Sequence, residues 1–354
     1  MRPERLPEDV EPGDLPHIPR PREQAGLVGH TEAEAALVAG IASGRLHHAW
    51  LIGGSRGIGK ATLAYRMARW LIANPGLDAI PETLHVDPGH PVARQVAALS
   101  HPNLVALRRT RPPTAKTLAT KISVDAARGA LELFGSTGGA AGYRICIVDS
   151  AEDLNANSAN ALLKMVEEPP PRSLFLIVSH APGRLLPAIR SRCRALTLRP
   201  LHEAEVARVV AGFPPPFVQP EAEALARAAA LSEGSVAQAM AMLDPATANL
   251  VAEVETLLVR LDHPDWRRIL ALAEKLAGRD SDDLFAASLD TVFRFVSAEL
   301  DRRAHEGPAR LAALVEVCDK IARAAREAAT YNLDRRPLVL SLFGDLAGAL
   351  RAAA

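Results

Sequence analysis

The chain has 354 residues, of which 48% are hydrophobic and only 4% aromatic. Its 41 Lys and Arg residues balance 41 Asp and Glu residues, so no overall positive charge attracts nucleic acid, and such a contact depends on a local patch or on partners. This length predicts two or three domains. Three widely spaced cysteines exclude a disulfide framework and a four-cysteine zinc site, and no apolar run is long enough to predict a membrane span. We therefore expect a cytoplasmic protein that does not bind a membrane.

The pattern along the chain predicts four regions. Residues 1–23 are rich in proline and charge, and we expect a disordered or extended arm there. Residues 24–199 alternate short apolar runs with helical patterns, which predicts an α/β domain with a parallel sheet and helices on both faces. The expected strands are Ala49–Ile52, Leu104–Leu107, Ile145–Val148, Leu174–Val178 and Ala195–Leu198. Residues 74–102, rich in Pro, Gly and His, predict an irregular insertion.

The strand pattern disappears after residue 199. Residues 200–246 predict a small helical unit, and residues 247–354 predict several longer helices. Breaks between these helices are expected near Gly278, Gly307 and Pro337.

A glycine-rich loop follows the first expected strand and precedes a helical pattern. Gly54, Gly57, Gly59 and Lys60 have the spacing of a P-loop, GxxxxGK. Glycines allow backbone N–H groups to turn toward phosphate oxygens, the helix N-terminus adds partial positive charge, and Lys60 would reach the outer phosphates. We expect a phosphate-binding site here.

The residue after the lysine departs from this pattern. A working P-loop has Ser or Thr there, because the hydroxyl holds Mg²⁺, but this chain has Ala61. Thr62 follows about 100° further around the helix, and we expect it to point elsewhere. Phosphate binding can survive this change, whereas magnesium positioning is lost.

A second acidic element shows a similar loss. The apolar run from Ile145 ends in Asp149, as in a Walker B strand. Hydrolytic members of the P-loop class carry Glu next, but Ser150 stands there and cannot act as a general base unaided. Glu152 and Asp153 follow beyond the expected strand end. Together the two losses predict a nucleotide-binding fold that does not hydrolyse ATP.

Several further motifs give the chain a resemblance to a known family. They are His47-His48-Ala49-Trp50-Leu51, Asn160-Ala161-Leu162-Leu163-Lys164, Glu167-Glu168-Pro169-Pro170 and Ile189-Arg190-Ser191-Arg192-Cys193. With the P-loop, they resemble the clamp-loader subunits of bacterial DNA polymerase III, a branch of the AAA+ family. The last hundred residues resemble the family only in helical character and in Tyr331-Asn332-Leu333-Asp334.

The resemblance implies an architecture and a set of partners. It implies an AAA+ P-loop domain over residues 24–199, a helical lid over 200–246 and a helical collar for oligomerisation over 247–354. The implied partners are the tau/gamma and delta subunits, with the sliding clamp and primed DNA met through the complex. The implied role is part of a DNA-directed DNA polymerase holoenzyme. Two hypotheses stay open: a non-hydrolysing stator, or an ATP-hydrolysing motor subunit of a clamp loader or related AAA+ machine.

The family comparison also bears on cofactors. Ala237 stands where an ATP-contacting arginine is usual in the lid, and Ser179 matches the first sensor position. The expected nucleotide site is therefore Gly54, Gly57, Gly59, Lys60 and Asp149, holding ATP or ADP without hydrolysis or staying empty; no cofactor is required. Many relatives carry a four-cysteine zinc module, but residues 63–143 contain no cysteine, so we expect no zinc; we interpret His85, His90 and His101 as loop residues.

Two groups of arginines have open roles. The resemblance implies that Arg192 is an arginine finger acting in trans on a neighbour's ATP; Arg190 is the rival, and a structural salt bridge is the alternative for Arg192. The densest basic cluster is either a solvated surface or a contact to the DNA backbone. It consists of Arg108, Arg109, Arg111, Lys116 and Lys121.

Overall fold

The computed structural model describes residues 18–77, 80–110, 119, 121–135, 141–215, 217–278, 281–331 and 333–352. It divides into two compact units, Met1–Met240 and Ala241–Ala354. The first unit combines the α/β region with the short helices that follow it. The finer predicted boundary at residue 199, between a P-loop domain and a lid, stays a prediction.

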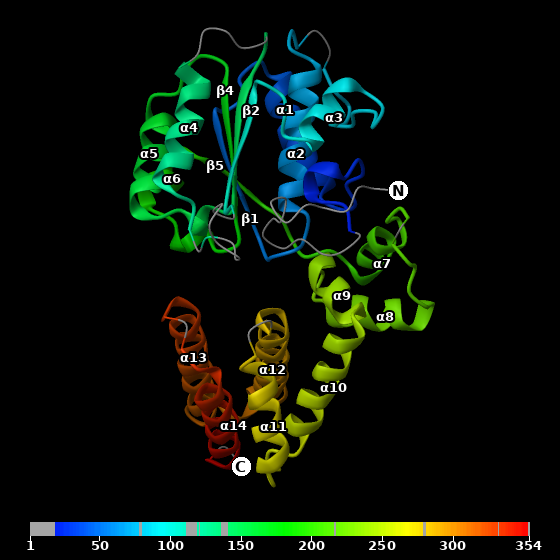
Figure 1. The fold of residues 1–354 in the computed structure, drawn as a ribbon, viewed down its shortest axis with the longest axis vertical. Coiled ribbons are helices and arrows are strands. Elements are labelled where there is room, and N and C mark those ends of the chain that lie inside the picture. The colour runs from blue at the N-terminus through cyan, green and yellow to red at the C-terminus, as the bar shows by residue number, and fades with distance from the viewer. Residues whose placement is uncertain are drawn as a thin grey trace. The chain divides into compact units, whose positions relative to one another are not determined.

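The first unit is built on a five-stranded parallel sheet, as the sequence predicts. The strands run in the order β2-β3-β4-β1-β5 (Figure 1). Their bounds are β1 Ala49–Gly53, β2 Leu104–Arg108, β3 Arg144–Asp149, β4 Ser173–Ser179 and β5 Arg194–Thr197. Because β4 lies between β1 and β3, it brings Ser179 between the glycine loop after β1 and Asp149 at the end of β3.

Alternate residues of each strand face opposite layers of helices. Trp50 and Ile52 of β1 belong to one hydrophobic core, and Ala49 and Leu51 belong to the other. Helices α1–α3 lie on one face of the sheet and α4–α6 on the other (Figure 1). Their bounds are α1 Thr31–Ala42, α2 Lys60–Ala73, α3 Pro91–Ala97, α4 Val124–Gly135, α5 Ala156–Glu167 and α6 Pro187–Arg192.

Helix α3 lies inside the segment predicted to be irregular. His90 caps its start, because Nδ1 accepts a hydrogen bond from Val92 N at 3.2 Å, and Pro91 occupies the first helical position. Seven residues are too few for a clear helical period, so the sequence pattern missed this helix.

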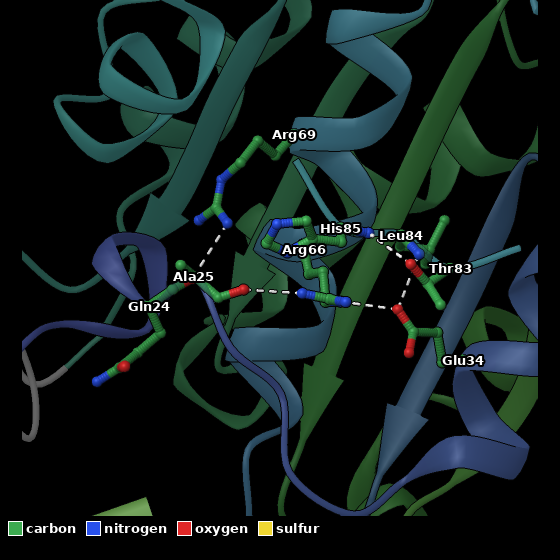
Figure 2. A network of polar contacts seen from close by, with 8 residues as sticks. All are labelled: Gln24, Ala25, Glu34, Arg66, Arg69, Thr83, Leu84 and His85. Atoms are coloured by element: carbon green, nitrogen blue, oxygen red, sulfur yellow. Dashed lines mark hydrogen bonds and ion pairs between the residues drawn. The ribbon is translucent and has the colours of Figure 1, made fainter. Parts of the chain in front are cut away.

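Buried arginines fasten the segment before α1 to the domain. Arg66 of α2 donates from Nη1 to Ala25 O at 2.8 Å and pairs through Nε with Glu34 of α1 at 2.7 Å (Figure 2). Arg69 donates to Gln24 O at 3.1 Å and to Arg22 O at 2.9 Å. Arg66 and Arg69 are thus anchors for backbone carbonyls of this segment.

This packing corrects the predicted arm at its end. Residues 1–17 lie outside the described residues, but Arg20 and Arg22 are buried, and Pro21–Glu23 form the 3₁₀ helix η2. Arg22 donates from Nε to Ala97 O at 2.7 Å, after α3. The proline-rich composition indicated a loose chain because it does not record that partners in α2 and near α3 satisfy these residues.

Three short helices close the first unit: α7 Glu203–Ala211, α8 Ala222–Leu231 and α9 Val236–Leu243. The sequence suggested one helical stretch over Glu221–Leu243, but the chain turns at Gly234, whose φ is +78°. A Cβ there would lie 2.5 Å from both N and O of Leu201, so only glycine fits. Val236 N then donates to Gly57 O at 3.0 Å, which ties the start of α9 to the glycine loop.

The second unit is entirely helical among its described residues. Its helices are α10 Pro245–Val259, α11 Trp266–Leu276, α12 Asp282–Arg302, the 3₁₀ helix η5 Ala304–Glu306, α13 Pro308–Tyr331 and α14 Arg335–Ala352. Their apolar faces share one core that includes Leu250, Leu272, Val292 and Phe343. The expected breaks near Gly278 and Gly307 occur, but Pro337 lies within the first turn of α14.

Candidate functional site

The glycine loop lies at the carboxyl edge of the sheet, between β1 and α2. Gly54, Gly57 and Gly59 have φ values of +140°, +77° and +102°, conformations that L side chains rarely adopt. A Cβ on Gly57 would collide with Ser235 Oγ and come within 2.7 Å of Ala237 Cβ. The loop therefore needs glycine both for its turns and for its contact with α9.

Lys60 is the first residue of α2 and is only 3% exposed. Its Nζ donates a hydrogen bond to Ser55 O, so the lysine closes its own loop. Burial lowers the pKa of Lys60 to about 8, although Asp149 and Glu152 favour the charged form. This lysine lies where the outer phosphates of a P-loop ligand would be bound.

Two carboxylates extend from the end of β3 into the same region. Asp149 is buried, and burial raises its pKa against the opposing effect of Lys60. Asp153 lies in the 3₁₀ helix η3, Ala151–Asp153, and pairs with Arg109 Nε at 2.8 Å. Burial raises the pKa of Asp153 too, while Arg109 acts in the opposite direction.

Glu152 proves to be part of the site, which the sequence did not indicate. It lies beyond the strand end as expected, yet its Oε1 accepts hydrogen bonds from Ser179 Oγ at 2.5 Å and from Ala181 N at 2.6 Å. Burial alone would raise its pKa, but these two hydrogen bonds outweigh it, and the pKa of Glu152 is lowered. Ser179 thus holds an ionised carboxylate beside the loop.

Ser150 also has a partner that only the fold reveals. Its Oγ lies 3.2 Å from Nε2 of His180, which follows β4. Burial, with Lys60 and Arg56 nearby, lowers the pKa of His180 to about 4, so the imidazole is neutral at neutral pH. The pairing places a neutral imidazole and a hydroxyl where a hydrolytic P-loop protein has a carboxylate.

These groups surround a cavity of about 470 Å³, a volume typical of small-molecule sites. One part of its wall is apolar and comes from the segment before α1 and from helices α7 and α9. Its members are Ile18, Leu27, Val28, Leu201, Val209, Phe213, Val236 and Met240. The other part is charged and comes from the glycine loop and the strand ends. This division suits a ligand with an apolar ring system and a charged end.

The predicted nucleotide residues meet at this cavity, with one correction. Gly57, Gly59, Lys60 and Asp149 line it, and Gly54 supports the loop from behind, against Leu198. Thr62, expected to point elsewhere, lines the cavity as well. The reason is that the cavity extends along the side of α2, where Tyr65 also borders it.

Magnesium does not fit the residues at the usual metal position. That ion is held by the hydroxyl after the lysine and by an ionised carboxylate, together with phosphate oxygens. Ala61 offers no oxygen, and burial of Asp149 favours its protonated form. We therefore derive no chemical step through a metal at this site.

The basic cluster suggested for DNA is partly explained by the cavity. Arg108 and Arg109 line it, and Arg109 pairs with Asp153. Lys121 donates to Glu152 O at 2.8 Å. Arg111 and Lys116 lie outside the described residues, so whether they reach DNA stays open.

Arg192 lies at the opposite edge of the sheet. It ends α6 just before β5, whereas the glycine loop follows the carboxyl end of the neighbouring strand β1. Five residues at about 3.3 Å each separate the two edges by about 16 Å. Arg192 borders a separate cavity of about 420 Å³, whose other lining residues include His47, His48, Cys193 and Arg194.

The Arg192 side chain is 42% exposed and is held at three points. Nη2 pairs with Glu167 Oε1 at 2.9 Å, and Nη1 donates to Ala188 O at 3.1 Å and to Ser191 Oγ at 3.3 Å. The predicted salt bridge therefore exists, but it leaves the guanidinium at the surface. A fixed, exposed guanidinium can still meet an anion on another molecule.

The three loop histidines serve local backbone contacts or solvent. His90 caps α3, His101 Nδ1 accepts from Asn103 N at 3.1 Å, and His85 is exposed. Among the residues that the structure describes, no three His, Cys, Asp or Glu side chains form a group able to hold a metal. The expectation of a zinc-free chain is tested by elemental analysis of the purified protein. No described helix combines the length and apolarity needed to cross a bilayer.

The fold and the site define an AAA+ P-loop protein: a parallel sheet with the glycine loop after β1, an acidic strand end at β3 and a helical C-terminal region. Residues 29–202 match the family model described as DNA polymerase III, delta subunit. Together with the relatives reported next, this match shows that the chain belongs to the clamp-loader family of DNA polymerase III subunits.

Three curated relatives illustrate the family. DNA polymerase III subunit tau of Escherichia coli is 28% identical over 79% of this chain and 42% of its own length. Subunit delta' of Pseudomonas aeruginosa is 35% identical over 41% of each chain, and that of Escherichia coli is 35% identical over 46% of each. The chain thus spans less than half the length of these relatives.

Solved structures with the same general arrangement are more distant. A DNA polymerase III gamma subunit-related protein of Thermotoga maritima covers 89% of this chain at 16% identity with a TM-score of 0.40. The RuvB Holliday junction branch migration motor of the same organism covers 91% at 18% identity with a TM-score of 0.41.

Proposed function

We propose that this chain is a delta prime-like subunit of the DNA polymerase III clamp loader in the cytoplasm. In this role it does not hydrolyse ATP but acts as a stator, beside tau/gamma and delta subunits, and helps to load the sliding clamp onto primed DNA. Arg192 is its arginine finger for the ATP of a neighbouring motor subunit. The observation that carries this proposal is the contrast between the two edges of the sheet: a pocket without its metal hydroxyl or catalytic carboxylate, and an exposed arginine on the far side.

The chemistry of the pocket supports a stator. Ala61 removes the hydroxyl for the metal, Ser150 replaces the carboxylate that polarises water, and Ala237 leaves the lid side without an arginine. Glu152 cannot simply replace the missing base, because its Oε1 accepts from Ser179 and Ala181. A nucleotide bound here would stay intact, since binding alone does not lower the barrier to hydrolysis.

Arg192 can supply what its own pocket lacks to another subunit. A planar guanidinium stabilises charge that develops on a phosphoryl group during transfer, and such a finger is worth about 10³–10⁵ in rate. Arg192 lies about 16 Å from its own glycine loop along β1, which excludes direct action in its own pocket. Ala188 and Glu167 fix the guanidinium near the surface, where a neighbour's phosphates could meet it.

The test is Arg192→Ala in a clamp loader reconstituted with the tau/gamma and delta subunits. We expect the complex to assemble, while DNA-stimulated ATPase activity and clamp loading fall at least tenfold. Arg190→Ala, two residues earlier on α6, is the matched control. Unchanged turnover in an assembled Arg192→Ala complex would overturn the finger.

The second candidate is a motor subunit that hydrolyses ATP. The observation in its favour is that subunit tau of Escherichia coli aligns with this chain over 79% of its length, further than the delta' relatives do. Turnover by the isolated chain separates the two: a stator stays at background, whereas a motor shows Mg²⁺-dependent release of phosphate.

A further inference from the structure

The cavity beside the glycine loop carries far more positive charge than the chain as a whole. The chain is formally neutral. Seven cationic side chains nevertheless line the cavity against three carboxylates, an excess of four positive charges among the described residues. The cations are Arg20, Arg22, Arg56, Lys60, Arg108, Arg109 and Arg208, and the carboxylates are Asp149, Glu152 and Asp153. Such a concentration of one sign attracts a polyanion.

The protein itself already compensates the carboxylates. Asp153 pairs with Arg109 at 2.8 Å, and Glu152 accepts hydrogen bonds from Ser179 and Ala181. Asp149 is buried beside Lys60, and its raised pKa reflects that burial. None of the three therefore depends on a divalent cation for its compensation.

Two arginines stand on either side of Lys60 at positions that the backbone fixes. Arg56 lies in the glycine loop itself, between Gly54 and Gly57, and its side chain is exposed. Arg108 ends β2 directly beside Asp149 in the ladder between β2 and β3. Both line the cavity with Lys60. Guanidinium groups bind phosphate oxygens through several donors and stay charged at every physiological pH.

We propose that this cavity binds a nucleoside polyphosphate without magnesium, with Arg56 and Arg108 beside Lys60 supplying the positive charge that a metal supplies in a hydrolytic P-loop. The inference deepens the proposed stator function and rests on its claim that hydrolysis is lost here. Guanidinium groups neutralise phosphate charge but do not generate a nucleophilic hydroxide as a metal does. The ligand is therefore held intact and stabilises the first unit.

The experiment measures binding of ADP and of AMP to the full chain by titration calorimetry, in buffer with magnesium chloride and in buffer with EDTA. We expect the Kd of ADP to agree within about twofold between the two buffers. ADP should bind at least about tenfold more tightly than AMP, since each charge-assisted contact to the second phosphate adds affinity. A tenfold loss of ADP affinity in EDTA, equal affinities for ADP and AMP, or no binding of ADP would each overturn the proposal.

Variants assign the charge to named side chains. Arg56→Gln and Arg108→Gln should each weaken ADP binding about tenfold and change AMP binding less. Arg128→Gln is the control, because Arg128 is exposed on α4 and does not line the cavity. Arg108 is half-buried, so if its variant misfolds, the exposed Arg56 decides: unchanged ADP affinity in Arg56→Gln contradicts its role.

Restoring the missing hydroxyl gives an independent readout. In Ala61→Thr, ADP binding should become tighter when magnesium is added, while binding in EDTA stays as in the natural chain. The absence of any magnesium response in this variant contradicts the assignment of metal independence to Ala61. Release of phosphate from ATP by the natural chain would instead refute the stator proposal, so the two failures are distinguishable.

Discussion

Arg192 and Glu167 form an ion pair of 2.9 Å that joins the end of α6 to the end of α5. Both side chains are more than a third exposed, so the pair adds little to stability. Its consequence is geometric: with the contact to Ala188 O, it holds the guanidinium of Arg192 in one orientation. Glu167 is therefore a positioning residue for the proposed finger.

Removing Glu167 should slow the neighbouring motor without disassembling the complex. We expect Glu167→Ala to lower stimulated ATPase activity of the reconstituted loader about two- to fivefold, which corresponds to the worth of an exposed pair of at most about 1 kcal/mol. Steady-state kinetics should place the loss in kcat and leave KM for ATP unchanged. Glu168→Ala, the adjacent exposed carboxylate, is the matched control.

A double-mutant cycle tests whether Glu167 acts through Arg192. In the Arg192→Ala background, Glu167→Ala should have no further effect on turnover. An equal loss in both backgrounds, or a faster reaction in Glu167→Ala, would contradict a positioning role.

Restoring the metal hydroxyl should not restore catalysis. We expect Ala61→Thr to hydrolyse ATP at the background rate, because Ser150 and His180 still occupy the place of the carboxylate that polarises water. The measurement is phosphate release by the purified variant, with a tau/gamma motor subunit as the positive control. A turnover rate that approaches the motor's would mean that the hydroxyl alone was missing.

The ion pair between Arg66 and Glu34 should contribute strongly to stability. Glu34 Oε1 accepts from Arg66 Nε at 2.7 Å and from Leu84 N at 2.9 Å, and the Arg66 side chain is only 9% exposed (Figure 2). Glu34→Ala leaves a buried cation without its partner and should lower the free energy of unfolding by roughly 3 kcal/mol. Urea denaturation measures it.

The exposed residue Arg128 provides the control for this prediction. Its contact with Asp125 is 3.9 Å long and largely solvated, so Arg128→Ala should change stability by less than about 0.5 kcal/mol. Similar losses in the two variants would show that the burial of the Arg66–Glu34 pair has no special effect.

His180 should make stability depend on pH between about 4 and 6.5. Burial lowers its folded-state pKa to about 4, below the ordinary value of 6.5, so the unfolded chain binds the proton more readily. The contribution is fully present above pH 6.5 and is lost as the pH falls toward 4. Its size is on the order of 1–3 kcal/mol, allowing for partial solvation of the ring.

The comparison with His180→Gln isolates this effect, because the titrating carboxylates are common to both chains. Urea unfolding at a series of pH values should show a flatter dependence for the variant between pH 5 and 6.5. Parallel curves for the two chains would show that His180 titrates alike in the folded and unfolded states.

Much of the fold was predictable because its signals are local. Each of the five strands was visible as a short apolar run, and the GxxxxGK spacing located the loop between Gly54 and Lys60. Asp149 was found because it directly ends an apolar run. Helix α3 escaped, since a single short helix capped by His90 has no period to detect.

The missed site residues have long-range causes. Glu152 and His180 are 28 positions apart in the chain and appear in the sequence as ordinary polar residues beyond strand ends. They meet because β3 and β4 are parallel neighbours, so the segments that follow these strands emerge at the same edge. The hydrogen-bond pairs Ser179–Glu152 and Ser150–His180 follow from that adjacency.

The sequence by itself determined which chemical groups this protein has and lacks: a glycine loop with Lys60, no hydroxyl at Ala61, and Arg192 within the Ser-Arg-Cys triplet. These features depend on residue type and near spacing, which the chain order records directly. The tertiary structure alone decided that Arg56 and Arg108 gather around Lys60 in a formally neutral chain and that Arg192 is paired with Glu167. The physical reason is that charge acts through space, and the order of strands in a parallel sheet, not the order of residues, sets which charges become neighbours.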